Sequence, residues 1–351
     1  MSLFGSSKTT SYLGIDIGIG GIKMVELANE KGRAKLMTYA YSERGFSEQG
    51  KTLLDNPKLV ADLLVKLAKQ SGATTVRAVS GLPQNAVFTA ALSLPTTKDP
   101  KQMKAMVEAQ VQKLASVPLP ELIIDSRMID EQPEKDKPKG HTRVLVTGAP
   151  KTLVSKYVEA FKTAKMELVA LETEAFALVR SLVGHDKSTV MILDVGAVRT
   201  NMTIVEKGIP FLTRSVNIGG AMLTKSIAEQ MKISVEEAEQ MKLDLSKDEA
   251  VAAPPVVESF LQPILNEINY SVGEFRRQEE HQMAKMEKII ITGGSAHLPG
   301  VVKYLGDKLN VNTYVGDPWA RVAVPEALRP VLDDIGPRFA VAIGLAMRDI
   351  E

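Results

Sequence analysis

The residues best placed for chemistry form a carboxylate, glycine and lysine pattern near the start of the chain. Asp16 ends an apolar strand pattern, Gly18, Gly20 and Gly21 follow it, and Lys23 comes next on a return strand. Glycines in such a turn let the backbone adopt positive φ and point its N–H groups at an anion. The pattern predicts a phosphate site, with Lys23 near a phosphate and Asp16 holding Mg²⁺ through its water shell.

Two common phosphate motifs do not fit this segment. A Walker A loop would need a Gly-Lys-Ser/Thr sequence, and a dinucleotide fingerprint would need a third glycine after Gly20-Gly21. Taken alone, the same residues are equally consistent with an ordinary glycine turn between two strands, and Lys23 with a surface charge.

Two further elements repeat this chemistry in the second half of the chain. The apolar run Val190–Val195 contains Asp194 at its end, and Gly196 follows. Another apolar run, Lys288–Ile291, leads into the Gly293-Gly294 pair. Paired glycines let a backbone approach a flat base or a ribose closely. The three elements together, in this order, favour a nucleotide site over three unrelated turns.

The chain also shows an internal repeat. The same module occurs twice, starting near residue 12 and again near residue 190. It consists of a hairpin with an acidic strand end, then further strands, then helices. The similarity between the two copies lies in Gly-Ile-Asp-Ile-Gly and Ile-Leu-Asp-Val-Gly. Between residues 85 and 167 the pattern changes to β-α-β-β-α, its last helix at Lys151–Lys165. We therefore predict a duplicated α/β protein with a subdomain inserted into its first lobe.

These motifs resemble those of the superfamily of actin, sugar kinases and heat-shock chaperone ATPases. The resemblance implies an actin-like (ribonuclease H-like) two-lobe ATPase fold with ATP and Mg²⁺ between the lobes. Leu171–Leu178 resembles its first connecting helix and Phe339–Ala346 its second, with small residues that allow a close crossing. Within the superfamily, the chain resembles the FtsA-like branch, and above all the PilM family of type IV pilus assembly, in residues 1–5, 14–27 and 92–95.

The resemblance also implies a set of site residues. Glu172 matches the glutamate that positions water in the chaperones and is the candidate catalytic residue. Glu239 and Lys242 lie where relatives contact ribose and base, although a solvated helix face is the commoner situation for such residues. Asp16 and Asp194 would hold Mg²⁺ through water. The expected ATP contacts are Asp16, Gly18, Ile19, Gly20, Gly21, Lys23, Asp194, Gly196, Ala197, Gly219, Gly220, Glu239, Lys242, Gly293, Gly294 and Ser295.

Three positions depart from the actin pattern. Ile19 stands where actins offer a hydroxyl to the γ-phosphate, Ala197 where they place a second carboxylate on the metal side, and Val198 where the second hairpin has a glycine. Phosphoryl transfer to water needs a positioned water and stabilised charge together. We therefore expect ATP binding with slow or undetectable turnover.

Family resemblance further implies a partner, the N-terminal cytoplasmic tail of PilN, held in a groove lined by residues from about 82 to 167. Other components of the pilus motor and self-association stay open. Two alternatives also stay open. A sugar-type kinase would need an acceptor-pocket aspartate that no separate motif indicates. A filament-forming FtsA-like protein would carry an amphipathic helix beyond the connecting helix, where this chain stops.

Composition excludes several classes of function. Lys and Arg number 43 against 42 Asp and Glu, so no bulk field attracts nucleic acid or anionic lipid. Cysteine is absent and the four histidines form no HExxH pair, which argues against a thiolate or histidine metal site. The start has no signal-peptide pattern and no apolar run reaches bilayer length. We expect a cytoplasmic protein that reaches the inner face of the inner membrane only through partners.

The expected subdomain boundaries follow from these patterns. They are residues 1–84, 168–188 and 337–351 for the first lobe (1A), 85–167 for the inserted subdomain (1C), 189–220 and 286–336 for the second lobe (2A), and 221–285 for a helical subdomain (2B).

Overall fold

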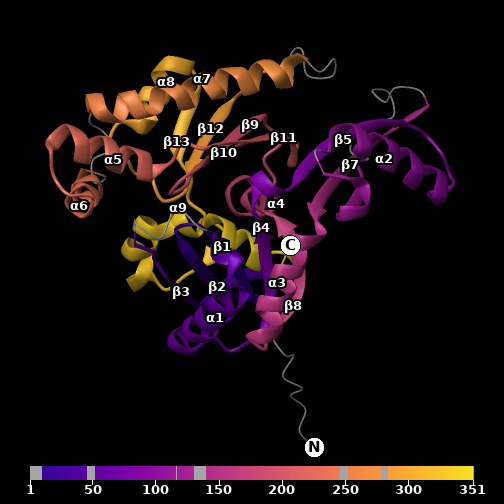
Figure 1. The fold of residues 1–351 in the computed structure, drawn as a ribbon, viewed down its shortest axis with the longest axis horizontal. Helices are drawn as coiled ribbons and strands as arrows, with labels where there is room; N and C mark the ends of the chain where they lie inside the picture. The colour runs from indigo at the N-terminus through magenta and orange to yellow at the C-terminus, as the bar shows by residue number, and fades with distance from the viewer. Residues whose placement is uncertain are drawn as a thin grey trace, which may run out of the picture.

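The computed structural model describes residues 10–45, 52–115, 117–129, 140–245, 252–277 and 284–350. Residues 1–5, which carry part of the family resemblance, and most of the charged segment at 131–140 lie outside the described residues. Figure 1 shows two lobes, one around β1 to β4 and one around β9 to β13, with a smaller sheet of β5 and β7 to one side. Three sheets build this arrangement.

The first sheet has the strand order β14-β3-β2-β1-β4-β8. Strands β1, β2 and β3 form antiparallel hairpins, whereas β4, β8 and β14 add in parallel. Its strands are β1 (Ser11–Gly18), β2 (Gly21–Glu30), β3 (Arg33–Tyr41), β4 (Arg77–Leu82), β8 (Glu167–Thr173) and β14 (Val322–Ala323).

The second sheet repeats that plan with the order β11-β10-β9-β12-β13. Two antiparallel hairpins are again followed by two parallel strands, so the predicted duplication of an actin-like fold is confirmed. Its strands are β9 (Val190–Val195), β10 (Thr200–Glu206), β11 (Ile209–Val216), β12 (Lys288–Thr292) and β13 (Asn312–Val315).

Helices cover these sheets. In the described residues none of them combines the length and the apolar character that a membrane span requires. The helices are α1 (Pro57–Ser71), α2 (Pro100–Leu114), α3 (Lys151–Thr163), α4 (Glu174–Leu178), α5 (Gly220–Met231), α6 (Val235–Leu245), α7 (Pro255–Arg277), α8 (Val301–Leu309) and α9 (Arg329–Ala346). A π-helical turn, Val179–Val183, extends α4.

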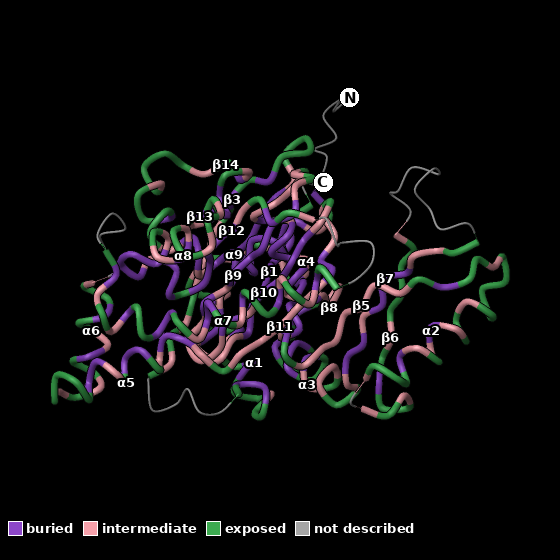
Figure 2. The backbone as a smooth tube through the Cα atoms, turned by 90° about the horizontal axis from the view of Figure 1, so that it is seen from above, coloured by how far each residue is buried: buried purple, intermediate pink, exposed green. Residues whose placement is uncertain are grey.

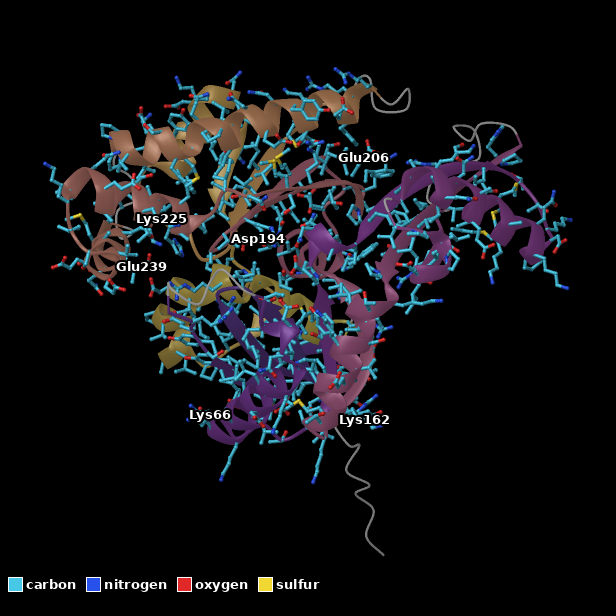
Figure 3. All side chains as sticks on the ribbon, in the orientation of Figure 1. Lys66, Lys162, Asp194, Glu206, Lys225 and Glu239 are labelled. Atoms are coloured by element: carbon cyan, nitrogen blue, oxygen red, sulfur yellow. The ribbon has the colours of Figure 1, made fainter. Side chains whose placement is uncertain are left out.

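The inserted subdomain is smaller than predicted. Its sheet has the order β5-β7-β6, with β5 (Phe88–Pro95), β6 (Leu122–Met128) and β7 (His141–Pro150), and α2 packs on it. The second predicted helix, α3, belongs elsewhere because Tyr157 and Phe161 bury themselves in the core of the first lobe beside α1. Figure 3 accordingly shows Lys66 of α1 and Lys162 of α3 both at the lower end of that lobe, on opposite sides of it. The inserted block is therefore β-α-β-β.

A second boundary also moves. Trp319, Val322 and Leu332 pack into the first lobe with Val25 and Leu27, and the indole Nε1 of Trp319 donates to the carbonyl of Leu332 at 2.8 Å. The prediction assigned residues up to 336 to the second lobe, but an apolar pattern does not say which of two sheets it will cover. The structure gives residues from about 319 onward to the first lobe.

The two lobes meet where α4 and α9 cross. Gly344 of α9 lies so close to α4 that an added Cβ would overlap the carbonyl oxygen of Ala177. Gly14 of β1 contacts α9 in the same way, because its Cβ would overlap the carbonyl oxygen of Ala342. Figure 2 shows the purple, buried part of the chain concentrated where α9, β1 and β9 lie together. The predicted close crossing of two connecting helices is confirmed, but the first of them begins only at Glu174, because Leu171–Thr173 still belong to strand β8.

This crossing predicts a strong steric effect. Gly344→Ala should lower the free energy of unfolding by at least about 2 kcal/mol, because backbone cannot move aside as a flexible side chain would. Gly273→Ala is the matched control, since Gly273 is exposed in α7 with open space around it. That control should raise stability by about 0.5–1 kcal/mol through helix propensity. Urea unfolding of both variants measures the difference, and equal effects would contradict the crossing.

Candidate functional site

A cleft of about 790 Å³ lies between the two sheets. Both acidic hairpins line it, and so do the Gly293-Gly294 turn and helix α6. Of the sixteen predicted ATP contacts, those that line it are Asp16, Gly18, Ile19, Gly20, Lys23, Asp194, Gly196, Ala197, Gly220, Glu239, Lys242, Gly293, Gly294 and Ser295. Residues far apart in the sequence therefore converge on one cavity.

Two predicted glycines do not line the cleft, and each has a structural reason to be glycine. Gly21 has φ +134°, and a side chain there would overlap the carbonyl oxygen of Ser42. Gly219 is the N-cap of α5, and its Cβ would lie 2.6 Å from backbone atoms of Val198 and Arg199. These glycines shape the two hairpins without facing the cavity.

The first hairpin holds its charged pair across adjacent strands. Asp16 on β1 is directly opposite Lys23 on β2, and Lys23 Nζ lies 3.6 Å from Asp16 Oδ2. Ser42 Oγ accepts from the Ile22 N–H at 3.1 Å, and the Arg44 N–H donates to the Gly20 carbonyl at 3.2 Å. The chain after β3 therefore supports the hairpin tip.

Asp194 is placed by the strands on either side of it. It is paired with Asn201 on β10 and with Thr292 on β12, at the point where β12 turns into Gly293. Gly293 has φ +91°, and a side chain there would overlap Asp194 Oδ1. Only glycine therefore lets the Gly-Gly turn pass this carboxylate.

Three carboxyl groups share the floor of the cleft, namely Asp16, Asp194 and Glu174. Burial and repulsion from Asp16 and Asp194 raise the pKa of Glu174 to about 8. Burial and Asp16 likewise raise the pKa of Asp194 to about 6, and burial raises that of Asp16 against the opposing effect of Lys23. The side chains of Glu174 and Asp194 keep part of their surface open to the cleft. This partial exposure raises the effective dielectric constant around the two carboxyl groups and so moderates their repulsion.

Glu174 is the residue that sequence reasoning missed. It begins α4, and its Oε2 accepts from the Gln84 N–H at 3.1 Å. The predicted residue, Glu172, lies two positions earlier on β8 and does not line the cleft. The clue available in the sequence was Thr173, because such a residue often precedes a helix start and would place Glu174 in its first turn.

Glu172 instead lies beside the crossing of α4 and α9. It accepts from Arg180, and Arg348 Nε lies 2.8 Å from its Oε1. Arg180 also donates through Nε to the carbonyl of Gly344 at 2.8 Å. Two arginines thus bind one carboxylate that is only 8% exposed, and the water-positioning role assigned to Glu172 is wrong for this geometry.

Lys242 and Glu239 form a polar group on the second lobe. Lys242 is buried, and its Nζ donates to Glu239 Oε2 at 2.7 Å and to Thr224 Oγ1 at 2.9 Å. Burial lowers the pKa of Lys242, against the opposing effect of its hydrogen bond and ion pair with Glu239. Figure 3 shows Glu239 on the helical part of the second lobe and Asp194 nearer the lobe junction. The alternative of a solvated helix face is therefore wrong for Lys242.

The cleft also suits a hydrated divalent cation. In the described part of the chain, no three His, Asp or Glu side chains converge closely enough to ligate an ion directly. Mg²⁺ keeps several waters and needs only one or two carboxylates. Three buried acidic groups whose pKa values lie above the ordinary ones would be stabilised in their ionised form by such a charge.

The carboxyl cluster predicts a pH-dependent stability. Folded-state pKa values above the ordinary ones mean that the folded protein keeps protons which the unfolded chain has released. The free energy of unfolding should therefore fall, by on the order of 1–3 kcal/mol, as pH rises from about 5 to about 8. Urea unfolding without nucleotide measures this slope. Glu174→Gln should flatten it and Glu258→Gln, at an exposed position of α7, should not; an unchanged slope in Glu174→Gln would contradict the cluster.

Known proteins place this geometry in a family. A solved structure described as the PilM–PilN type IV pilus biogenesis complex is 25% identical, with a TM-score of 0.77 over 97% of this chain and 98% of that one. MreB5 of Spiroplasma citri, solved with AMPPNP, is 12% identical, with a TM-score of 0.52 over 96% and 95% of the two chains, and shares the fold.

Among curated proteins, the cell division protein FtsA of Bacillus subtilis is 26% identical over 61% of this chain. The match spans 55% of the length of that FtsA, about half of the relative. The family model described as type IV pilus assembly protein PilM matches residues 14–350. The acidic hairpins, the Gly-Gly turn and the connecting helices all fall within that range, and the chain belongs to the PilM family of type IV pilus assembly proteins.

Proposed function

We propose that the cleft binds ATP with Mg²⁺ and that the protein serves as a nucleotide-binding scaffold of type IV pilus assembly. The observation that carries this proposal is the convergence of both acidic hairpins and the Gly-Gly turn on one cavity. MreB5, which shares the fold, was solved with the ATP analogue AMPPNP, and this supports a nucleotide in the corresponding cleft.

Different parts of the cleft would contact different parts of Mg²⁺-ATP. The glycine turn after Asp16 and the turn at Gly196 would face the phosphates, with Lys23 supplying positive charge. Asp16 and Asp194 would hold Mg²⁺ through water, and the ion would offset phosphate charge. Lys242 and Glu239 would meet the ribose end beside the open backbone of Gly294.

Turnover should be slow. Ile19, Ala197 and Val198 all line the cleft, so the three departures from the actin pattern lie where nucleotide would lie. Each of them offers an apolar side chain in place of a polar contact or a flexible glycine. Glu174 replaces Glu172 as the candidate for positioning a water.

The Mg²⁺-ATP site predicts a loss of binding without a loss of stability. Asp16→Asn should weaken Mg²⁺-ATP binding at least about tenfold, or about 1.4 kcal/mol, because one carboxylate leaves the metal side. Thermal unfolding should stay at or above the wild-type midpoint, since one of three repelling groups is gone. Titration with a fluorescent ATP analogue measures binding. Asp125→Asn, on the exposed face of β6, is the control, and wild type without measurable binding would overturn the assignment.

We further propose that the partner is the N-terminal tail of PilN, a membrane protein, which would bring this protein to the inner membrane. Support comes from the 25% identical PilM–PilN complex, whose PilM-type fold spans 97% of this chain. The tail would bind where the inserted sheet joins the first lobe. The joints lie between β4 and β5 and between β7 and α3.

A peptide titration tests this partner. A labelled peptide with the sequence of the N-terminal tail of PilN from the same genome should bind saturably, measured by fluorescence anisotropy with and without Mg²⁺-ATP. A peptide of the same composition in scrambled order is the control, because it keeps charge and length but not sequence. Equal binding of the two peptides under both conditions would remove PilN as the partner.

A further inference from the structure

One buried residue bonds to both lobes at the root of the inserted sheet. Gln84 is only 5% exposed. It is the first residue of a 3₁₀ turn, Gln84–Ala86, which connects the end of β4 to the start of β5. β4 belongs to the first lobe and β5 to the inserted sheet. Any shift of this turn must therefore change where the inserted sheet leaves the first lobe.

Gln84 contacts the cleft through its backbone. Its N–H donates to Glu174 Oε2 at 3.1 Å, and Glu174 shares the cleft floor with Asp16 and Asp194. The neighbouring residues Pro83, Asn85 and Ala86 line the cleft themselves. A cation or phosphate that moves the Glu174 carboxyl, or changes its protonation, would directly affect its hydrogen bond with the Gln84 N–H.

Its side chain reaches the second lobe. Gln84 Nε2 donates to Thr203 Oγ1 at 2.7 Å and to the carbonyl of Met202 at 3.5 Å, both on β10. Thr203 is fully buried and lies opposite Thr213 on the next strand, β11. The amide oxygen of Gln84 is buried and has no hydrogen-bond partner among the residues that the structure describes. Such a group is costly, which indicates that the amide is held here for its donor contacts.

The inserted sheet also touches the second lobe, beside these contacts. Ala91 of β5 packs against the second lobe's core, and the Arg143 guanidinium of β7 lies 4.7 Å over the Phe211 ring of β11. Arg127 of β6 lies over the Phe176 ring of α4 at 5.9 Å. Figure 1 shows β5 and β7 approaching β11 and α4 from the side. The sheet is therefore positioned by both lobes, with Gln84 at its root.

We propose that Gln84 is a positioning residue that couples nucleotide in the cleft to the placement of the inserted sheet. The inference rests on the proposed function, since it needs Mg²⁺-ATP as the occupant of the cleft. Closure of the second lobe on nucleotide would pull on Gln84 through Thr203, while the same nucleotide acts on Glu174 from the other side. The sheet that we expect to hold the partner would then sense the state of the cleft.

Hydrogen exchange of the full-length protein tests the coupling. Mg²⁺-ATP should slow amide exchange in β5 and β7 of the wild type by about fivefold or more, the lower end of usual coupling between sites. Gln84→Ala and Thr203→Ala, which remove the two ends of the same bond, should each reduce that effect to less than about twofold. The double variant should lose no more than either single variant, because both substitutions break one interaction.

Controls separate this inference from the proposed function and from simple loosening. Thr142→Val removes the exposed Thr96–Thr142 hydroxyl contact at the far end of the same sheet and should keep the wild-type response. Nucleotide titration of each variant comes first. Wild type that binds no nucleotide would overturn the proposed function and this inference with it. Variants that bind nucleotide and keep the full exchange response would overturn the inference alone. If Gln84→Ala does not fold, the exchange response of Thr203→Ala provides the test.

Discussion

Close contact between backbones at the crossing of α4 and α9 is the constraint on which the rest of this molecule depends. Gly344 lies against the Ala177 carbonyl, and Gly14 lies against the carbonyl of Ala342, so strand β1 and both connecting helices share one contact region. A side chain at either glycine would separate the elements that deliver the two halves of the cleft. The Arg180 and Arg348 pairs with Glu172 hold the same region together electrostatically.

The crossing also determines the chemistry of the cleft, because α4 begins at Glu174. Packing of this short helix against α9 directs its first residue toward Asp16 and Asp194, where burial and the charges of these two carboxylates raise the pKa of Glu174. The folded chain thus keeps acidic groups together at a cost to its own stability. Groups retained against such repulsion are typical of sites that receive a charged ligand. In this cleft a divalent cation with a polyphosphate is the ligand whose charges fit.

The composition of the same cleft favours the proposal that it retains nucleotide more than it turns it over. Carboxylates and glycine turns would receive a metal and phosphates, whereas Ile19, Ala197 and Val198 add apolar side chains to the lining. A nucleotide held in this way would act mainly on the relative position of the lobes. The inserted sheet contacts both lobes and is joined to them at Gln84, so a change of lobe position has a direct structural path to the surface where a partner would bind.

The sequence by itself determined the duplicated fold, the two acidic hairpins and the Gly-Gly turn, because glycines and strand-end carboxylates act through the local backbone. Even the family could be inferred from these motifs. Tertiary structure alone decided which glutamate enters the cleft, since Glu172 and Glu174 differ only in lying before or after the turn from β8 into α4. It also decided that α3 and Trp319 pack on the first lobe. An amphipathic pattern specifies that a face is buried, but the partner of that face depends on the distant segments that fold against it.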